Sequence, residues 1–342
     1  MIFRLDYRRY RQPLRTALRT AHGVLAERRG VLVRLEDGTG AAGYGEAAVL
    51  PWFGTESADE AAEACAALGG QVGADALAAI PERLRCLRFA LQAAAERNGP
   101  APARNHLPVA ALLPAGRQAL EKIGPLAEAG FRTFKWKVGA GDMGSELGLL
   151  DDVCAALPAG AKLRLDANGA WSRRQAERWL ERGAERPVEF VEQPVAADAR
   201  GAEDLLRGLA ADFPTPIALD ESLAGDADVA RWLGNGWPGV FVVKPSLLGD
   251  AVAVLERLAA AKAKVVFSSA LETAAGARAA LRLAFRWAGE SDSTASPRAR
   301  ALGFGVWPLF KDARLDGPAA APFLRVEDVE KINVEAAWNA LS

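Results

Sequence analysis

The feature that most constrains the fold is an alternation of short apolar runs with amphipathic stretches, which begins near residue 107 and continues past residue 300. Such alternation predicts a parallel sheet with crossover helices, and eight units favour its closure into a barrel. The predicted strands are residues 107–113, 133–138, 162–166, 188–192, 216–220, 240–244, 264–268 and 301–305. The predicted helices include residues 117–129, 145–156, 173–182, 202–211, 251–261 and 270–287.

An open, doubly wound α/β sheet is the alternative architecture. No glycine-rich dinucleotide fingerprint follows the first predicted strand, which argues against it. Upstream, strand-like and alanine-rich helical segments predict a small α+β capping domain over residues 1–100, which ends in a linker near residues 98–104. We therefore expect an α/β barrel over residues 101–309 and a C-terminal segment, residues 310–342, that returns to the capping domain.

Composition and charge restrict the class of function. Lys and Arg number 42 against 43 Asp and Glu, so no basic excess points to nucleic acid or to an anionic membrane, and a small-molecule partner is expected. Three cysteines, an odd number without metal-type spacing, are typical of a reducing compartment. Arginines occupy the N-terminus where a signal peptide would be apolar, and no apolar run approaches the length of a membrane span. We expect a cytoplasmic protein.

Each predicted strand from the second to the sixth ends in ionisable residues. From the second strand onward the intervals between them are 24 to 29 residues, about one strand–helix unit each. In a barrel, such positions ring the C-terminal mouth, where active sites of this architecture lie. The residues are Lys135, Lys137, Asp166, Glu192, Asp220 and Lys244.

The three carboxylates predict a metal site. Asp166, Glu192 and Asp220 each follow an apolar strand, and three clustered anions repel one another unless a cation lies between them. One such carboxylate alone would be explained by helix capping, but three in successive units would not. Because every ligand would be oxygen, we expect Mg²⁺ before Mn²⁺ or Ca²⁺. Neutralisation by the lysines with no metal present is the alternative, and charge counting leaves it open.

The lysines are candidates for catalysis. The chain has nine lysines against 33 arginines, and three of the nine lie at strand ends. A lysine can be tuned to act as a base, whereas an arginine keeps its proton. Lys135 and Lys137 face the same side of one strand and Trp136 the other, so that one ammonium can lower the pKa of its neighbour. Lys244 comes from a strand approximately across the barrel.

Five ordered motifs resemble the enolase superfamily, in its muconate-lactonising subgroup: FKWKVG at 134–139, LDANGAW at 165–171, VEQP at 191–194, ALDES at 218–222 and VVKPSLLG at 242–249. The resemblance implies a modified (β/α)7β barrel, capped by the N-terminal segment together with the C-terminal tail. It also implies that Asp166, Glu192 and Asp220 bind Mg²⁺. Many relatives have Glu-Glu-Pro or Glu-Asp-Pro where this chain has VEQP, but Gln193 is not the ligand in that pattern.

Further segments resemble the o-succinylbenzoate synthase family in its cyanobacterial and plant form: PLRTALRTAHG at 13–23, GYGEAAVLPWFGTES at 43–57, PVAALLP at 108–114 and FSSALET at 267–273. This implies a Mg²⁺-dependent syn dehydration of 2-succinyl-6-hydroxy-2,4-cyclohexadiene-1-carboxylate to 2-succinylbenzoate, in menaquinone or phylloquinone biosynthesis. Lys137 would remove the proton and then protonate the departing hydroxide. Lys135 would assist it, and Lys244 would stabilise the anionic intermediate from the opposite side.

Substrate contacts are expected from a lid and from two loops. Loops 20–23 and 51–54 are candidate lids, in which Trp52 and Phe53 would cover the ring unless they pack within the small domain. Asn168 follows Asp166 by two residues and is a candidate substrate contact. Ser268 and Ser269 precede a predicted helix whose N-terminus could accept the succinyl carboxylate, although a simple helix cap explains them equally well.

Rival functions use the same residue types. The related N-acylamino-acid racemases and dipeptide epimerases share the lysines and the metal ligands, but the epimerases usually carry Asp-x-Asp at the eighth strand, where this chain reads GFGVW at 303–307. A Schiff-base lyase would use Lys137 or Lys244 as a nucleophile and has no need of three carboxylates. A non-catalytic binding barrel would need neither the lysines nor a complete ligand set.

Overall fold

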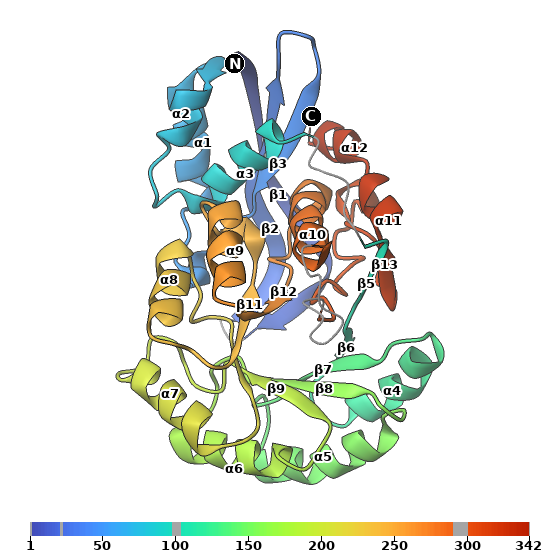
Figure 1. Ribbon diagram of the computed structural model, residues 1–342. Coiled ribbons are helices and arrows are strands. Elements are labelled where there is room, and N and C mark those ends of the chain that lie inside the picture. The colour runs from blue at the N-terminus through green and yellow to red at the C-terminus, as the bar shows by residue number, and fades with distance from the viewer. Residues whose placement is uncertain (1, 21–22, 98–103, 290–299, 342) are drawn as a thin grey trace.

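A computed structural model describes residues 2–20, 23–97, 104–289 and 300–341 of the chain. Figure 1 shows an antiparallel sheet, drawn in blue, beside a curled parallel sheet whose helices lie on its outer side. Most of the predicted linker and residues 21–22 of the predicted first lid loop lie outside the described residues. No helix in the described ranges is both long and apolar enough to cross a membrane.

The N-terminal region is a four-stranded antiparallel sheet of order β3-β2-β1-β4 with helices packed on it. Helix α3 lies directly on β3, because Gly43 and Gly45 have no side chain to keep the two elements apart. A Cβ at either position would overlap the carbonyl group of Ala94 or Ala90. The elements are β1 (Ile2–Thr20), β2 (Gly23–Glu36), β3 (Ala42–Ala47), η1 (Pro51–Phe53), α1 (Ala58–Leu68), β4 (Gln71–Gly73), α2 (Ala74–Ala78) and α3 (Arg85–Ala95).

The second sheet has seven parallel strands in the order β12-β11-β10-β9-β8-β7-β6. Its strands are β6 (Ala111–Leu113), β7 (Thr133–Lys137), β8 (Lys162–Asp166), β9 (Val188–Glu192), β10 (Ile217–Leu219), β11 (Val240–Val243) and β12 (Lys264–Phe267). The predicted eighth strand is reduced to two parallel bridges, in which Gly303 pairs with Ser268 and Leu302 with Val109. These bridges close the sheet, so the predicted capped α/β barrel is confirmed.

Helices follow the strands and bury their apolar sides against the barrel. They are α4 (Gln118–Glu128), α5 (Met143–Ala156), α6 (Arg173–Gly183), α7 (Ala202–Asp212), α8 (Asp226–Gly234), α9 (Ala251–Ala260) and α10 (Ala274–Gly289). Aspartate side chains start two of them: Asp142 accepts the N–H of Ser145 at α5, and Asp250 caps α9. On the outer face of β7, Trp136 packs edge-on against Trp179 of α6.

Two predicted boundaries are wrong, each for a local reason. The first predicted strand, residues 107–113, is two strands: β5 (His106–Pro108) pairs with β13 (Phe323–Arg325), and β6 pairs with β7. Helix α10 begins at Ala274 rather than near residue 270. There the hydroxyl of Ser269 accepts the N–H of Leu271, whose φ of 59° is incompatible with a helix.

The C-terminal tail contacts the N-terminal sheet. After η3 (Ala313–Leu315) the chain forms β13, α11 (Val326–Glu330) and α12 (Val334–Asn339). Trp338 of α12 packs with Tyr10 and Leu32 in one buried cluster. The guanidinium of Arg8 lies 4.3 Å from the Trp338 ring centroid and donates to its carbonyl oxygen at 2.6 Å. Figure 1 shows this tail, in red, beside α10.

Candidate active site

Five of the predicted strand-end groups meet at one end of the barrel. The Nζ of Lys135 lies 2.8 Å from Glu192 Oε1 and 2.9 Å from Asp166 Oδ2, and the ammonium group of Lys244 hydrogen-bonds to Asp220. The strand register brings them to one level, because Asp166 lies opposite both Lys137 of β7 and Glu192 of β9. Closure of the parallel sheet thus places groups from five consecutive strands together.

Burial controls the electrostatics of the site. Asp166, Glu192 and Asp220 are only 7%, 2% and 6% exposed. Burial and the charge of Asp166 raise the pKa of Glu192, in spite of the opposing effect of Lys135. Burial opposes the charge on Lys135, but the two carboxylates beside it outweigh burial and raise the pKa of Lys135. Burial lowers the pKa of Lys244 to about 7.

Lys137 lies on the same strand face as Lys135, two residues further along β7, and is half-buried. The intervening Trp136 is fully buried on the opposite face. Lys244 reaches the carboxylates from β11, which is separated from β7 in the sheet by β8, β9 and β10. The structure therefore places amino groups on two sides of the carboxylate cluster.

Asn168 lies at this site and forms a pair that the sequence reasoning missed. Its side-chain amide donates to Glu221 Oε1 at 3.1 Å, and its backbone N–H donates to Asp166 Oδ1 at 3.2 Å. Burial and the charges of Asp166 and Glu192 raise the pKa of Glu221 to about 7. The only signal for Glu221 in the sequence is its place directly after Asp220.

Gln193 is a second group whose role was missed. It is fully buried and has a φ of 38°. Its Oε1 accepts the backbone N–H groups of Asp220 and Ser222, each at 3.1 Å. Its Nε2 donates to Val195 O and to Ser222 Oγ, each at 2.9 Å. Gln193 therefore connects the loops after β9 and β10 and fixes the backbone that carries Asp220.

Trp52 and Phe53, the residues predicted for a lid, lie beside the barrel mouth. The Nζ of Lys244 is 4.6 Å from the ring centroid of Phe53, which comes from η1 of the N-terminal region. Phe53 and Trp52 line a cavity of about 510 Å³ together with Asn168 and Glu221. The aromatic pair therefore lies beside the barrel mouth as well as against the core of the small domain.

The serine loop differs from its prediction. At the N-terminus of α10 the N–H groups of Thr273 and Gly276 donate to Glu46, so a side-chain carboxylate of the protein lies where the prediction placed a ligand carboxylate. The Ser269 hydroxyl is used within the loop, where it donates to Glu272 Oε2 at 2.7 Å. Ser268 directly follows β12, and its Oγ lies 3.5 Å from the carbonyl oxygen of Gly303.

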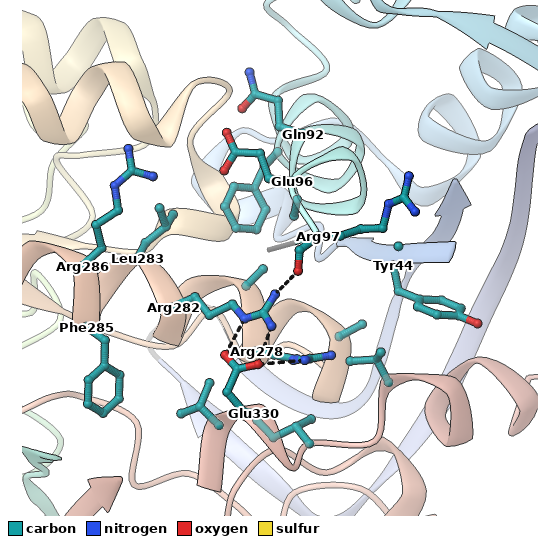
Figure 2. Close-up of a pocket in the computed structure, with 18 of the residues that line it drawn as sticks. Tyr44, Gln92, Glu96, Arg97, Arg278, Arg282, Leu283, Phe285, Arg286 and Glu330 are labelled. Atoms are coloured by element: carbon teal, nitrogen blue, oxygen red, sulfur yellow. Dashed lines mark hydrogen bonds and ion pairs between the residues drawn. The ribbon is translucent and has the colours of Figure 1, made fainter. Parts of the chain in front are cut away.

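A larger cavity of about 840 Å³ lies elsewhere, between α3, α10 and the C-terminal helices. In Figure 2, Arg278 and Arg282 of α10 both pair with Glu330, and Arg282 also donates to the carbonyl oxygen of Arg97. None of the strand-end carboxylates lines this cavity. Chemistry therefore favours the barrel mouth over the larger cavity as the candidate active site.

The donor set at the barrel mouth fits a hard divalent cation. Within the described ranges, no three acidic, histidine or cysteine side chains form a preassembled metal centre, and ammonium groups lie among the carboxylates instead. Two buried oxygens at the site, Glu221 Oε2 and Asn168 Oδ1, have no hydrogen-bond partner. Mg²⁺ prefers oxygen ligands, and the site clusters carboxylate and amide oxygens, two of which have no hydrogen-bond partner.

Known proteins resemble this chain in sequence and in fold. The model of the enolase C-terminal domain-like family matches residues 118–321. The o-succinylbenzoate synthase of Thermosynechococcus vestitus is 41% identical over 309 residues, which cover 89% of this chain and 92% of the relative. A hydrophobic dipeptide epimerase of Roseobacter litoralis is 39% identical, but over only 33% of this chain and 32% of its own length.

Solved structures lead to the same family as the sequence relatives. The crystal structure of the o-succinylbenzoate synthase from Thermosynechococcus elongatus, complexed with Mg in the active site, has a TM-score of 0.83 and 37% identity, and the match covers 99% of this chain and 100% of that one. The L-Ala-D/L-Glu epimerase of Bacillus subtilis, at 21% identity and a TM-score of 0.78 over 95% and 96% of the two chains, shares the fold. This chain therefore belongs to the o-succinylbenzoate synthase family of the enolase superfamily.

Proposed function

We propose that the chain is an o-succinylbenzoate synthase, which dehydrates 2-succinyl-6-hydroxy-2,4-cyclohexadiene-1-carboxylate to 2-succinylbenzoate. The observation that carries the proposal is the placement of lysines on two sides of one buried carboxylate cluster, in a chain that is 41% identical to such an enzyme over most of its length. The pathway would be that of menaquinone or phylloquinone.

Asp166, Glu192 and Asp220 would hold Mg²⁺, which supplies Lewis-acid stabilisation of the negative charge that develops on the substrate carboxylate. Lys137 takes the proton from the carbon next to that carboxylate and returns it to the departing hydroxide on the same face. Lys135 is held charged between Asp166 and Glu192 and contributes a fixed positive charge beside Lys137.

Lys244 acts from the other side, where its amino group contacts Asp220 beneath the Phe53 ring. There it stabilises the anionic intermediate electrostatically. Phe53 and Trp52 exclude water from the ring of the substrate, and Asn168 and Ser268 are the polar groups placed to orient it. Ser269 remains a weaker candidate for substrate contact, since its hydroxyl is already bonded within the loop.

We also propose that residues 1–100 and 310–342 form the cap of a barrel over residues 101–309. The contact of Trp338 with the N-terminal sheet and that of Phe53 with Lys244 support this division. The three cysteines are free, two of them buried, which supports a reducing and cytoplasmic setting.

The test measures o-succinylbenzoate formation by the purified protein with Mg²⁺, after removal of metal with a chelator, and in Lys137→Ala. We expect activity in the sample with Mg²⁺ and none in the chelated sample or in Lys137→Ala. Addition of Mg²⁺ or Mn²⁺ should restore the activity of the chelated sample, and the control Lys162→Ala should keep full activity. Lys162 is an exposed residue at the opposite end of β8. Full activity in the chelated sample or in Lys137→Ala would contradict the mechanism.

A further inference from the structure

Side chains of the N-terminal sheet hydrogen-bond to the loop that joins β12 to α10. On β3, Glu46 Oε2 accepts the N–H of Thr273 at 2.8 Å, the Thr273 hydroxyl, and the N–H of Gly276 at 3.1 Å. Tyr10 of β1 donates its hydroxyl to the other oxygen of Glu46. Arg28 of β2 donates to the carbonyl oxygen of Leu271 at 2.9 Å. Two strands of the cap, β2 and β3, thus bond directly to one loop of the barrel, and β1 supports Glu46 through Tyr10.

The hydrogen bonds between Glu46 and the loop are buried and closely packed. Glu46 and Thr273 are both 0% exposed, so the donors that Glu46 satisfies have no access to water. A side chain at Gly276 would come within 2.8 Å of Glu46 Oε2 and of Glu272 Cβ, which leaves the first turn of α10 no room to move towards the carboxylate. Loss of this carboxylate would leave buried donors without partners, and the loop would have to rearrange to satisfy them.

The held loop carries a side of the candidate site. On its other flank, the Ser269 N–H donates to the Gly303 carbonyl oxygen at 3.1 Å, so the loop is fixed between the cap and the segment that closes the barrel. Ser268 directly follows β12, and Val243 pairs with Phe267, so Ser268 lies next to Lys244 at the barrel mouth. The Ser268 N–H also donates to the Val243 carbonyl oxygen at 2.9 Å, so the sheet fixes the backbone of Ser268 on one side and the cap holds the loop that follows it.

We propose that Glu46 is a positioning residue for the dehydration: through its bonds to Thr273 and Gly276 it fixes the loop that places Ser268 against the bound substrate. The inference rests on the proposed function. Glu46 acts through the loop and contributes no proton to the reaction. It therefore governs how tightly the substrate is held, whereas the lysines on β7 and β11 govern the chemical step.

The test compares Glu46→Ala with Glu46→Gln. In Glu46→Gln the amide oxygen still accepts from Thr273 and Gly276 while the amide NH₂ donates to Tyr10, so we expect near-normal kinetics. In Glu46→Ala we expect KM to rise by about tenfold or more with kcat changed by less than about threefold, and the Kd of the product o-succinylbenzoate to rise in parallel, which is the effect of losing hydrogen bonds of ordinary strength.

Leu35→Ala is the matched control, because Leu35 is a fully buried residue of the cap that touches none of these bonds. It should lower the unfolding temperature and leave KM unchanged. A rise in KM of equal size in Leu35→Ala, or an unchanged KM in folded Glu46→Ala, would overturn the inference. If Glu46→Ala does not fold, Thr273→Val removes one donor at constant shape and should raise KM about threefold; an unchanged KM there refutes the inference equally. Absence of dehydration in the wild-type protein would instead refute the proposed function.

Discussion

Replacement of Glu272 by glutamine should make the protein more stable at alkaline pH and leave it unchanged in acid. Glu272 is fully buried, its Oε1 has no hydrogen-bond partner, and Glu46 adds a second negative charge nearby. Burial is the main cause that raises the pKa of Glu272 from its ordinary 4.5 to about 7, against the opposing effect of the Ser269 hydroxyl. The folded state therefore prefers the protonated carboxyl.

The sign follows from this preference. The contribution of Glu272 to stability is fully present below about pH 4.5 and is lost as the pH rises through about 7. Because each pH unit between the unfolded and folded pKa corresponds to about 1.4 kcal/mol, the wild-type protein loses about 3 kcal/mol that Glu272→Gln retains at pH 8. The other charged or titratable groups of this cluster, Arg28, Tyr10 and Glu46, are common to both proteins.

Urea unfolding of both proteins, followed at pH 4.5, 6, 7 and 8 with a chelator present, measures the difference in the free energy of unfolding. The difference should be near zero at pH 4.5 and should grow to its full size by pH 8. A difference that is constant with pH would refute the reasoning, since it would show that Glu272 has the same pKa in both states.

Two further pairs of substitutions test the packing around the site and in the cap. Gln193→Leu leaves four buried groups without a hydrogen-bond partner and should lower the free energy of unfolding by about 2–6 kcal/mol. Gln193→Glu keeps both bonds that the side chain accepts, so its free energy of unfolding should fall by about half as much. Equal stabilities of the two variants in urea unfolding would contradict the role assigned to Gln193. Gly45→Ala would force Cβ into the Ala90 carbonyl and should lower the free energy of unfolding by about 1–3 kcal/mol, while Gly38→Ala, which meets nothing within 4 Å, should change it by less than about 0.5 kcal/mol. Equal melting temperatures for these two alanine variants would show that α3 does not pack tightly on β3.

Most of the barrel could be predicted from sequence because its strands are short, apolar and repeated. The observed β8 and β9 have the same bounds as the predicted strands 162–166 and 188–192. Such strands are buried on both faces and stand out from the amphipathic helices between them. The same regularity predicted which residues end the strands, and parallel pairing alone then brings Lys137, Asp166 and Glu192 to one level.

Features that depend on distant partners could not be predicted in this way. Residues 107–113 are one continuous apolar run, and only the antiparallel partner β13, more than two hundred residues away, separates β5 from β6. The start of α10 depends on the left-handed backbone of Leu271 and on Glu46, which comes from the cap. The role of Gln193 likewise comes from its left-handed backbone and from its bonds to the next loop.

The sequence left two explanations of the carboxylate cluster, a metal or the lysines, and the structure is compatible with both acting together. Lys135 and Lys244 are bonded to Asp166, Glu192 and Asp220, yet Glu221 Oε2 remains buried without a partner. Burial together with residual repulsion also keeps the pKa of Glu192 raised. A cluster that already holds two ammonium groups and still has unused acceptors is suited to a further cation, so the lysines that would act on the substrate and the carboxylates that would hold the metal belong to one arrangement rather than to two competing ones.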